Sequence, residues 1–132
     1  MSIVYVDTSV ALAHLLSEDR RPPDDLWYSE LISSRLLEYE VWNRLHALDL
    51  AGSHADVARL TLARLAFVEL SPDALERARH PFPAPVRTLD ALHLSCASFL
   101  RERGVDIAVA TYDRRQARAA RAMGFDLVPL SN

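Results

Sequence analysis

The stretch Ile3-Val4-Tyr5-Val6-Asp7-Thr8-Ser9 predicts a buried β-strand that is followed directly by the start of a helix. The β-branched and aromatic residues at positions 3–6 suit a strand that is covered on both faces. The side-chain oxygens at positions 7–9 suit the N-terminal cap of a helix, which we expect from about Val10 to Leu16. A continuous apolar strand that leads straight into a helix is typical of a parallel sheet packed between helices.

The same alternation of strands and helices continues along the chain. Further strands are predicted at 30–33, 67–70, 107–110 and 127–128, and further helices at 35–51, 53–65, 71–79, 88–103 and 113–123. Gly52, Gly104 and Gly124 are each expected just after the end of a helix. The expected fold class is α/β: a single domain over residues 1–132, with a central parallel sheet of four to five strands and helices on both faces.

The composition excludes several classes of protein. The chain has 132 residues, half of them hydrophobic, and its formal net charge of −3 disfavours a strongly cationic, general nucleic-acid binder. All 15 basic residues are arginine, and the absence of lysine excludes Schiff-base chemistry and a Walker-type phosphate loop. The single cysteine, Cys96, excludes an internal disulfide and a zinc site of paired cysteines.

The chain also lacks the features of a membrane or exported protein. Its N-terminal residues have no basic region and reach an aspartate early, so they do not resemble a signal peptide. The apolar runs are shorter than the roughly 20 residues that span a bilayer. We therefore expect a cytoplasmic protein that makes no membrane contact.

Two aspartates are predicted at the carboxyl ends of strands, where open parallel sheets bind their ligands. Asp7 directly follows the first strand, and Asp113 follows the strand 107–110 after Thr111 and Tyr112. A carboxylate at the edge of a buried apolar run is costly unless something uses it. These two residues are therefore candidate site residues.

Two further acids lie on helices, at positions that the fold could bring to the same edge. Asp90 is in the first turn of the helix 88–103. Glu40 lies beside Leu37 and Val41 on the buried stripe of the helix 35–51. Glu38 is its rival, but two residues apart on a helix is about 200° of rotation, so only one of the two faces a given site. We select Glu40.

Each of the four acids also has a purely structural interpretation. The two strand-end aspartates would cap helices, Asp90 would favour a helix dipole, and Glu40 would pair with Arg44. If the carboxylates converge instead, each pair at about 4 Å repels by about 4 kcal/mol at an effective dielectric of about 20, so the cluster must bind protons or cations. All-oxygen ligands select Mg²⁺ or Mn²⁺, which position water and stabilise in-line displacement at a phosphodiester.

Four segments resemble the motifs of the PIN-domain ribonucleases and, within that family, of the VapC toxins of bacterial toxin–antitoxin modules. The match is best in Arg87-Thr88-Leu89-Asp90-Ala91-Leu92-His93-Leu94, which is similar to the family's R-x-x-D-A-L-H-L stretch. In chain order, the other segments are Val4-Tyr5-Val6-Asp7-Thr8-Ser9, Ser33-Ser34-Arg35-Leu36-Leu37-Glu38-Tyr39-Glu40-Val41, and Thr111-Tyr112-Asp113 with Ala117, Ala120 and Gly124. Their order and spacing extend the resemblance over the whole chain.

The resemblance implies a Mg²⁺-dependent endoribonuclease, with Mn²⁺ able to substitute, that hydrolyses phosphodiester bonds in structured RNA such as tRNA. It also implies a cognate antitoxin that binds and inhibits the toxin, and a homodimer. The principal metal ligands would be Asp7 and Asp90. The other two acids of the site, acting directly or through water, would be Glu40 and Asp113. The supporting hydroxyls would come from Ser9 and Thr111.

Basic charge is concentrated in the second part of the chain. Residues 77–132 hold nine arginines against five acids, whereas residues 1–76 hold six against thirteen. A candidate face for RNA phosphates closely follows Asp113 and contains Arg114, Arg115, Arg118 and Arg121. Of these we select Arg114, Arg115 and Arg118 as contacts, with a solvated helix face as the alternative. His93 is expected to be a packed core histidine, with a place behind the acidic site or a contact with RNA as its alternatives.

Two other functions stay open at this stage. The first is a catalytically silent PIN-fold binding module whose role lies in its partner complex. The second is a phosphatase or phosphotransferase that forms an aspartyl-phosphate at Asp7. The chain has Ser9 where that chemistry expects a second acid, and it lacks the usual lysine.

Overall fold

Strand β1 (Ile3–Val6) lies at the centre of a five-stranded, all-parallel sheet, which explains its uninterrupted apolar sequence. The structure is a computed structural model that describes residues 2–17 and 20–130. The sheet order is β3-β2-β1-β4-β5. The other strands are β2 (Leu31–Ser34), β3 (Ala66–Val68), β4 (Ile107–Ala110) and β5 (Asp126–Leu127). The predicted α/β class and parallel sheet are confirmed.

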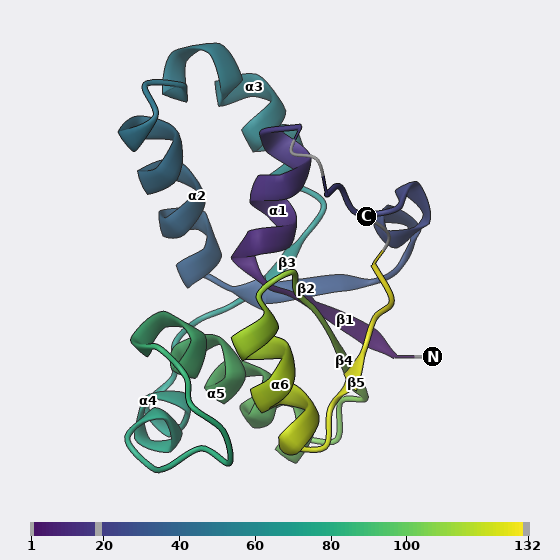
Figure 1. Ribbon diagram of the computed structural model, residues 1–132, viewed down its shortest axis with the longest axis vertical. Helices are drawn as coiled ribbons and strands as arrows, with labels where there is room; N and C mark the ends of the chain where they lie inside the picture. Colours follow the sequence, from purple (N-terminus) through teal and green to yellow (C-terminus); the bar gives the residue numbers. More distant parts are fainter. Residues whose placement is uncertain (1, 18–19, 131–132) are drawn as a thin grey trace.

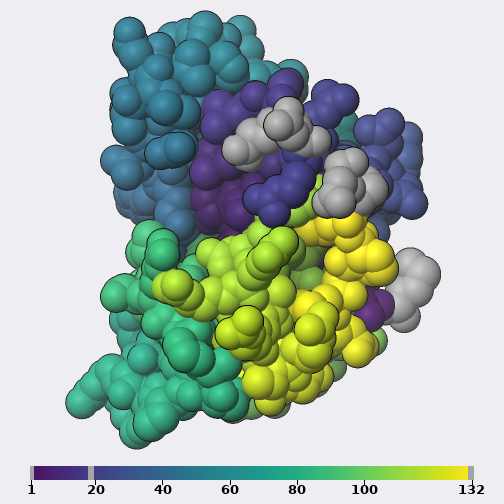
Figure 2. All heavy atoms as spheres, viewed as in Figure 1, coloured from purple at the N-terminus to yellow at the C-terminus, as the bar shows by residue number. Residues whose placement is uncertain are grey.

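Helices cover both faces of the sheet, as the buried strands require (Figure 1). One layer packs on Val4 and Val6 of β1, and the other packs on Tyr5, whose side chain points to the opposite face. The first layer consists of α1 (Thr8–Leu15), α2 (Leu36–Ala47) and α3 (Ala51–Leu62). A short 3₁₀ turn at Asp24–Tyr28, between α1 and β2, packs in the same layer. The second consists of α4 (Pro72–Ala78), α5 (Thr88–Glu102) and α6 (Arg114–Ala122). Figure 2 shows these layers as the upper and lower halves of the molecule.

The strand order places a topological switch point between β1 and β4. The chain builds β1, β2 and β3 in one direction across the sheet, and then crosses over to place β4 and β5 on the other side of β1. Val6 pairs with Ala110, so the residues that follow these strands, Asp7 and Thr111, emerge side by side. Parallel α/β sheets bind ligands at this kind of position, beyond the carboxyl ends of the strands.

The first half of the chain differs from the prediction mainly at the junction of α2 and α3. The predicted helix 53–65 runs over Ala51–Leu62 instead. The predicted helix 35–51 ends earlier, because Asp49 adopts a left-handed backbone (φ 56°) and the Leu50 N–H bonds the Leu45 carbonyl at 2.8 Å. Aspartate tolerates this conformation better than most residues, so it replaces glycine in this helix-ending motif. Gly52 lies inside α3, and its predicted position after a helix is wrong.

The other two glycines have the predicted role. Gly104 and Gly124 follow α5 and α6 with φ values of 89° and 88°. In each case the next residue closes the helix by bonding back to the carbonyl five residues earlier, as in Phe125 N–H to Ala120 O at 3.0 Å. The predicted positions of Gly104 and Gly124 just after a helix are therefore confirmed.

The helices among the described residues are short. The longest helix, α5, has 15 residues. Within residues 2–17 and 20–130, none of the helices combines the length and the apolar character needed to cross a membrane.

Candidate active site

Asp7 is buried just after β1 and is held by two hydroxyl groups, one from the first turn of α1 and one from the residue that follows β4. Its Oδ2 accepts hydrogen bonds from Ser9 Oγ at 2.6 Å and from Thr111 Oγ1 at 2.9 Å. The same oxygen accepts the Ser9 backbone N–H at 3.3 Å, so Asp7 also caps α1. Asp7 therefore has its structural role as a helix cap, and that cap uses only one of its two carboxylate oxygens.

Asp90, in the first turn of α5, faces two other carboxylates. Burial is the main cause that raises its pKa, and repulsion from Asp113 and then from Asp7 adds to the effect. A hydrogen bond from the Arg87 backbone and the proximity of His93 partly oppose this rise. Its Oδ2 is buried and has no hydrogen-bond partner. One oxygen of the ionised carboxylate therefore lacks a hydrogen-bond donor from the protein.

The raised pKa of Asp90 predicts that Asp90→Asn stabilises the metal-free protein near neutral pH. The proton is bound more tightly in the folded state. Binding of this proton therefore stabilises the folded protein fully below the ordinary carboxyl pKa. This stabilisation is lost as the pH rises through the raised pKa of Asp90. Near neutral pH the folded protein carries a poorly compensated charge, which asparagine removes. Urea unfolding in EDTA should give a higher midpoint for the variant near neutral pH, and a smaller gain in acid. An unchanged or lower neutral midpoint would contradict this prediction.

Glu40 is fixed by two hydrogen bonds to a single oxygen. Its Oε1 accepts the Thr8 hydroxyl at 2.8 Å and lies 2.6 Å from His93 Nε2. Glu38 instead pairs with Arg35 at 2.6 Å. Of the two glutamates, Glu40 is thus the one beside the end of β1, and its carboxylate contacts His93 and Thr8 where the sequence suggested Arg44.

His93 connects Glu40 to the hydroxyl of Tyr5 in the core. Tyr5 Oη accepts the Ser34 N–H at 3.1 Å, and it lies 2.8 Å from His93 Nδ1. Burial is the main cause that raises the pKa of Tyr5 well above its usual value, so the phenol keeps its proton and donates it to Nδ1. The Nε2 nitrogen then carries the histidine hydrogen and donates to Glu40. His93 is buried in the core, as predicted, and it also contacts the acidic site.

Tyr5→Phe is expected to destabilise the protein by about 2 kcal/mol, because it leaves Ser34 N–H and His93 Nδ1 buried without a partner. The free energy of unfolding in urea measures the effect. Tyr39→Phe is the matched control, since Tyr39 is 73% exposed and its loss of a hydroxyl should change little. A Tyr5→Phe effect as small as that of the control would show that the Tyr5 hydroxyl does not satisfy Ser34 N–H and His93 Nδ1 in the folded protein.

Asp113 caps α6, which was its structural interpretation. Its Oδ1 accepts the backbone N–H groups of Arg115 at 2.8 Å and Gln116 at 3.0 Å. Its own N–H donates to Thr111 Oγ1 at 3.0 Å. Its charge still acts at the site, because it contributes to the raised pKa of Asp90.

Gln116 joins the two central aspartates and was missed in the sequence. With its amide oriented so that nitrogen faces the carboxylates, the amide nitrogen donates to Asp7 Oδ1 and Asp90 Oδ1, each at 3.0 Å. The side chain is fully buried. A signal was present: Gln116, Ala119 and Ala120 share one face of an otherwise arginine-rich helix, and glutamine is out of place on a buried face.

Two of the four acids, Asp7 and Asp90, are placed together in a way that suits a divalent cation. Among residues 2–17 and 20–130, no three His, Cys, Asp or Glu side chains are grouped so that all could hold one ion. The four acids are thus not preformed as one ligand set. The Asp7–Asp90 pair offers only oxygen atoms, and Asp90 Oδ2 is buried and unpartnered. Mg²⁺ is usually bound by one or two carboxylates and keeps several waters, so the pair suits it.

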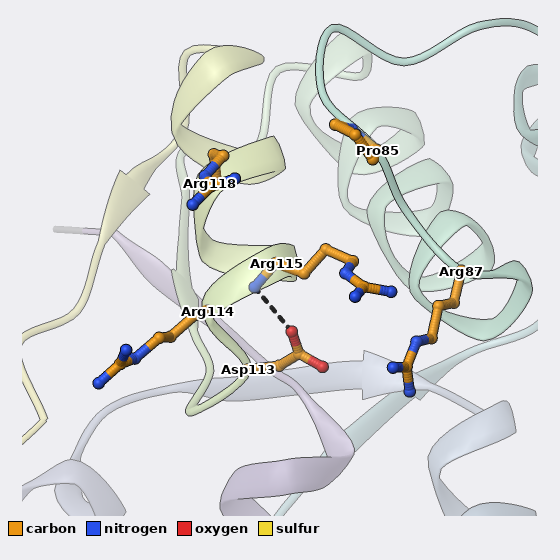
Figure 3. A pocket seen from close by; sticks show the side chains of 6 residues that line it. All are labelled: Pro85, Arg87, Asp113, Arg114, Arg115 and Arg118. Carbon is orange, nitrogen blue, oxygen red and sulfur yellow. Dashed lines mark hydrogen bonds between the residues drawn. The ribbon is translucent and has the colours of Figure 1, made fainter.

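An arginine-lined pocket of about 520 Å³ contains Asp113 and reaches Arg87, three residues before Asp90 in the chain. In Figure 3, Arg115 of α6 and Arg87 at the start of α5 extend toward each other across the space between the helices, whereas Arg114 points to the other side of Asp113. The pocket is lined by Pro85, Arg87, Asp113, Arg114, Arg115 and Arg118. All three predicted arginines line it, and Arg87, which was not selected as a contact, joins them.

The site geometry agrees with the comparison to known families. A family model described as "PIN domain" matches residues 4–122. The chain belongs to the PIN-domain family. This PIN domain is 32% identical to Ribonuclease VapC46 of Mycobacterium tuberculosis (strain ATCC 25618 / H37Rv), over 97% of the chain and 98% of that protein. It also has the fold of a chain in a toxin-antitoxin complex from Klebsiella pneumoniae, with a TM-score of 0.62, 16% identity, and coverage of 98% and 99% of the two chains.

Proposed function

We propose that this PIN domain is a Mg²⁺-dependent endoribonuclease and acts as the toxin of a toxin–antitoxin module. The observation that carries the proposal is the carboxylate pair Asp7–Asp90 at the switch point between β1 and β4, with one buried and unpartnered oxygen. The 32% identity to a protein named as a ribonuclease extends over nearly the full length of both chains, which supports the same class of reaction.

Asp7 and Asp90 would hold the cation, and the surrounding residues prepare them for it. A bound divalent cation lowers the pKa of water and stabilises negative charge that develops at a phosphodiester. Ser9 and Thr111 fix one oxygen of Asp7 through their hydroxyls, so its orientation does not depend on the metal. Gln116 fixes the other. Fixed donors of this kind avoid reorganisation during the reaction.

Glu40 is the carboxylate to which we assign the proton from the attacking water. His93 and Thr8 hold its Oε1, and a carboxylate held in this way presents its second oxygen in a defined orientation. His93 is in turn held by Tyr5. Asp113 acts through its charge on Asp90 and by starting α6, the helix that carries Gln116 and the pocket arginines.

The arginine pocket supports RNA as the substrate. Arg87, Arg115 and Arg118 line one pocket together with Asp113, whose charge acts on Asp90, so their guanidinium groups offer positive charge to a phosphodiester chain at the site. Arginine binds phosphate through a planar set of donors, so the absence of lysine does not weaken such a surface. Contacts of this kind position the RNA and carry no sequence information, and structured RNA such as tRNA remains the proposed target class.

A cognate antitoxin is the proposed partner. One of the solved structures with this fold is a toxin-antitoxin complex, which supports a protein partner for this chain. Large apolar side chains are exposed on the first helix layer, among them Tyr39 on α2 and Leu60 on α3. A homodimer is also proposed. Light scattering on the purified protein, with and without the product of a neighbouring small gene, measures both assemblies.

Incubation of the purified protein with total RNA tests the proposed function. We expect discrete cleavage in Mg²⁺ or Mn²⁺, no cleavage in EDTA, and 5′ and 3′ ends that map to internal phosphodiester bonds. Addition of the antitoxin should stop the reaction. Intact RNA in every metal, together with retained RNA binding, would identify a catalytically silent binding module instead.

A further inference from the structure

Gln116 is the single glutamine of the chain, and its side chain is fully buried on the sheet-facing side of α6. A buried amide without hydrogen-bond partners is costly, so its nitrogen and oxygen need defined contacts. The hydrogen-bond acceptors for the amide nitrogen are two carboxylate oxygens from different elements. One belongs to Asp7 at the end of β1, and the other belongs to Asp90 on α5.

The donors and acceptors in this contact match in number. A primary amide nitrogen carries two hydrogens, and in this site it has two acceptors, Asp7 Oδ1 and Asp90 Oδ1, each at 3.0 Å. Both acceptors are carboxylates, which make stronger hydrogen bonds than neutral oxygens. The opposite amide orientation would direct a carbonyl oxygen at two carboxylates, and like partial charges would repel.

The bridge uses one carboxylate oxygen of each aspartate, and the two remaining oxygens differ in their hydrogen bonds. The second oxygen of Asp7 is taken by the hydroxyls of Ser9 and Thr111, whereas the second oxygen of Asp90 is buried without a partner. Gln116 therefore fixes how the two carboxylates face each other and leaves one defined oxygen uncommitted. A neutral donor can do this without adding the formal charge that a lysine or arginine would bring beside a cation.

We propose that Gln116 is a positioning residue that bridges Asp7 and Asp90 in the metal-free protein and sets the geometry in which the pair receives its cation. That the pair serves RNA cleavage rests on the proposed function, whereas the bridge itself is a property of the metal-free chain. Gln116 is assigned no contact with substrate or metal, and its effect passes through the two carboxylates.

Gln116→Leu removes the amide donors while keeping the approximate volume of the side chain. We expect it to lower the rate of RNA cleavage by at least about tenfold, because small displacements of catalytic groups are costly. Ser95→Ala is the matched control: Ser95 is also fully buried, and its hydroxyl has no hydrogen-bond partner in the structure, so it does not hold the acidic pair. The control should cleave RNA at the rate of the unaltered protein.

Side-chain amide signals in ¹⁵N NMR of the full chain in EDTA test the bridge without relying on activity. The chain has only three such groups, Gln116, Asn43 and Asn132, so the Gln116 pair is assigned by its loss in Gln116→Leu. Asn43 is exposed and serves as the internal reference. We expect both Gln116 amide protons to exchange with solvent at least about tenfold more slowly than those of Asn43. Asp90→Asn and, separately, saturating Mg²⁺ should both shift the Gln116 signals and leave Asn43 in place.

The outcomes separate the bridge from the proposed function. Gln116 signals that move in Asp90→Asn support the bridge even if the protein cleaves no RNA, in which case the proposed function fails alone. The bridge is overturned if the Gln116 amide protons exchange as fast as those of Asn43, or if Asp90→Asn leaves their signals unchanged. Active Gln116→Leu protein, with cleavage equal to that of Ser95→Ala, would overturn the positioning role.

Discussion

Asp7→Asn and Asp90→Asn are each expected to lower the rate of Mg²⁺-dependent RNA cleavage by at least about a hundredfold. Each change removes one carboxylate charge from the pair at the end of β1 and the start of α5, and a bound cation contributes several kcal/mol of transition-state stabilisation. Single-turnover cleavage of a defined RNA, with protein in excess, measures the chemical step separately from product release.

The control for this pair is Asp56→Asn on α3. Asp56 is almost fully exposed, and its side chain pairs with Arg59 on the surface, so the change removes one acid without touching the site. Asp90→Asn should lose activity and yet be more stable than the unaltered protein in EDTA. A variant that loses activity because its fold is damaged would be less stable instead. Cleavage by both site variants at the rate of Asp56→Asn would remove the assignment of the active site.

Replacing Arg87, Arg115 and Arg118 together by glutamine is expected to weaken RNA binding by about a hundredfold or more at moderate salt, with a smaller loss for each single change. These side chains line the same pocket as Asp113. RNA binding releases the cations that surround the phosphates, and each lost arginine–phosphate contact reduces the number of cations released. The slope of log Kd against log salt should therefore fall by about 0.7 for each arginine that contacts a phosphate in single-stranded RNA.

Arg121→Gln is the matched control for the pocket arginines. Arg121 lies on the same helix, in its last turn, and does not line the pocket. It removes the same charge, so a general effect of net charge would appear in the control as well. Equal effects of Arg121→Gln and Arg118→Gln on affinity and on the salt slope would show that the pocket is a solvated helix face.

The central part of the fold was predictable because its signals are local. A β-branched run followed by Asp7 fixes both the central strand and the position of its strand-end acid. Glycines after α5 and α6 mark the ends of those helices. The choice of Glu40 over Glu38 followed from helix geometry, and the structure places Glu40, not Glu38, beside Thr8.

The missing parts depend on contacts between distant segments. Gln116 contacts Asp7, more than a hundred positions away in the chain, and Asp90, about twenty-five positions away. No local pattern shows which residues α6 packs against. The link from Tyr5 through His93 to Glu40 likewise joins β1, α5 and α2. The end of α2 was misplaced because Asp49 takes a left-handed conformation that the sequence rule assigns to Gly52.

Titration of the ¹⁵N-labelled protein with Mn²⁺, followed by paramagnetic broadening of its NMR signals, tests the location of the metal site most directly. Mn²⁺ binds all-oxygen sites as Mg²⁺ does, and it broadens only signals from residues close to it. We predict that the backbone signals of Asp7, Asp90 and Thr111 disappear first, that excess Mg²⁺ restores them, and that Asp90→Asn abolishes the effect. Early broadening elsewhere on the chain, with these three signals intact, would contradict a metal site at the Asp7–Asp90 pair.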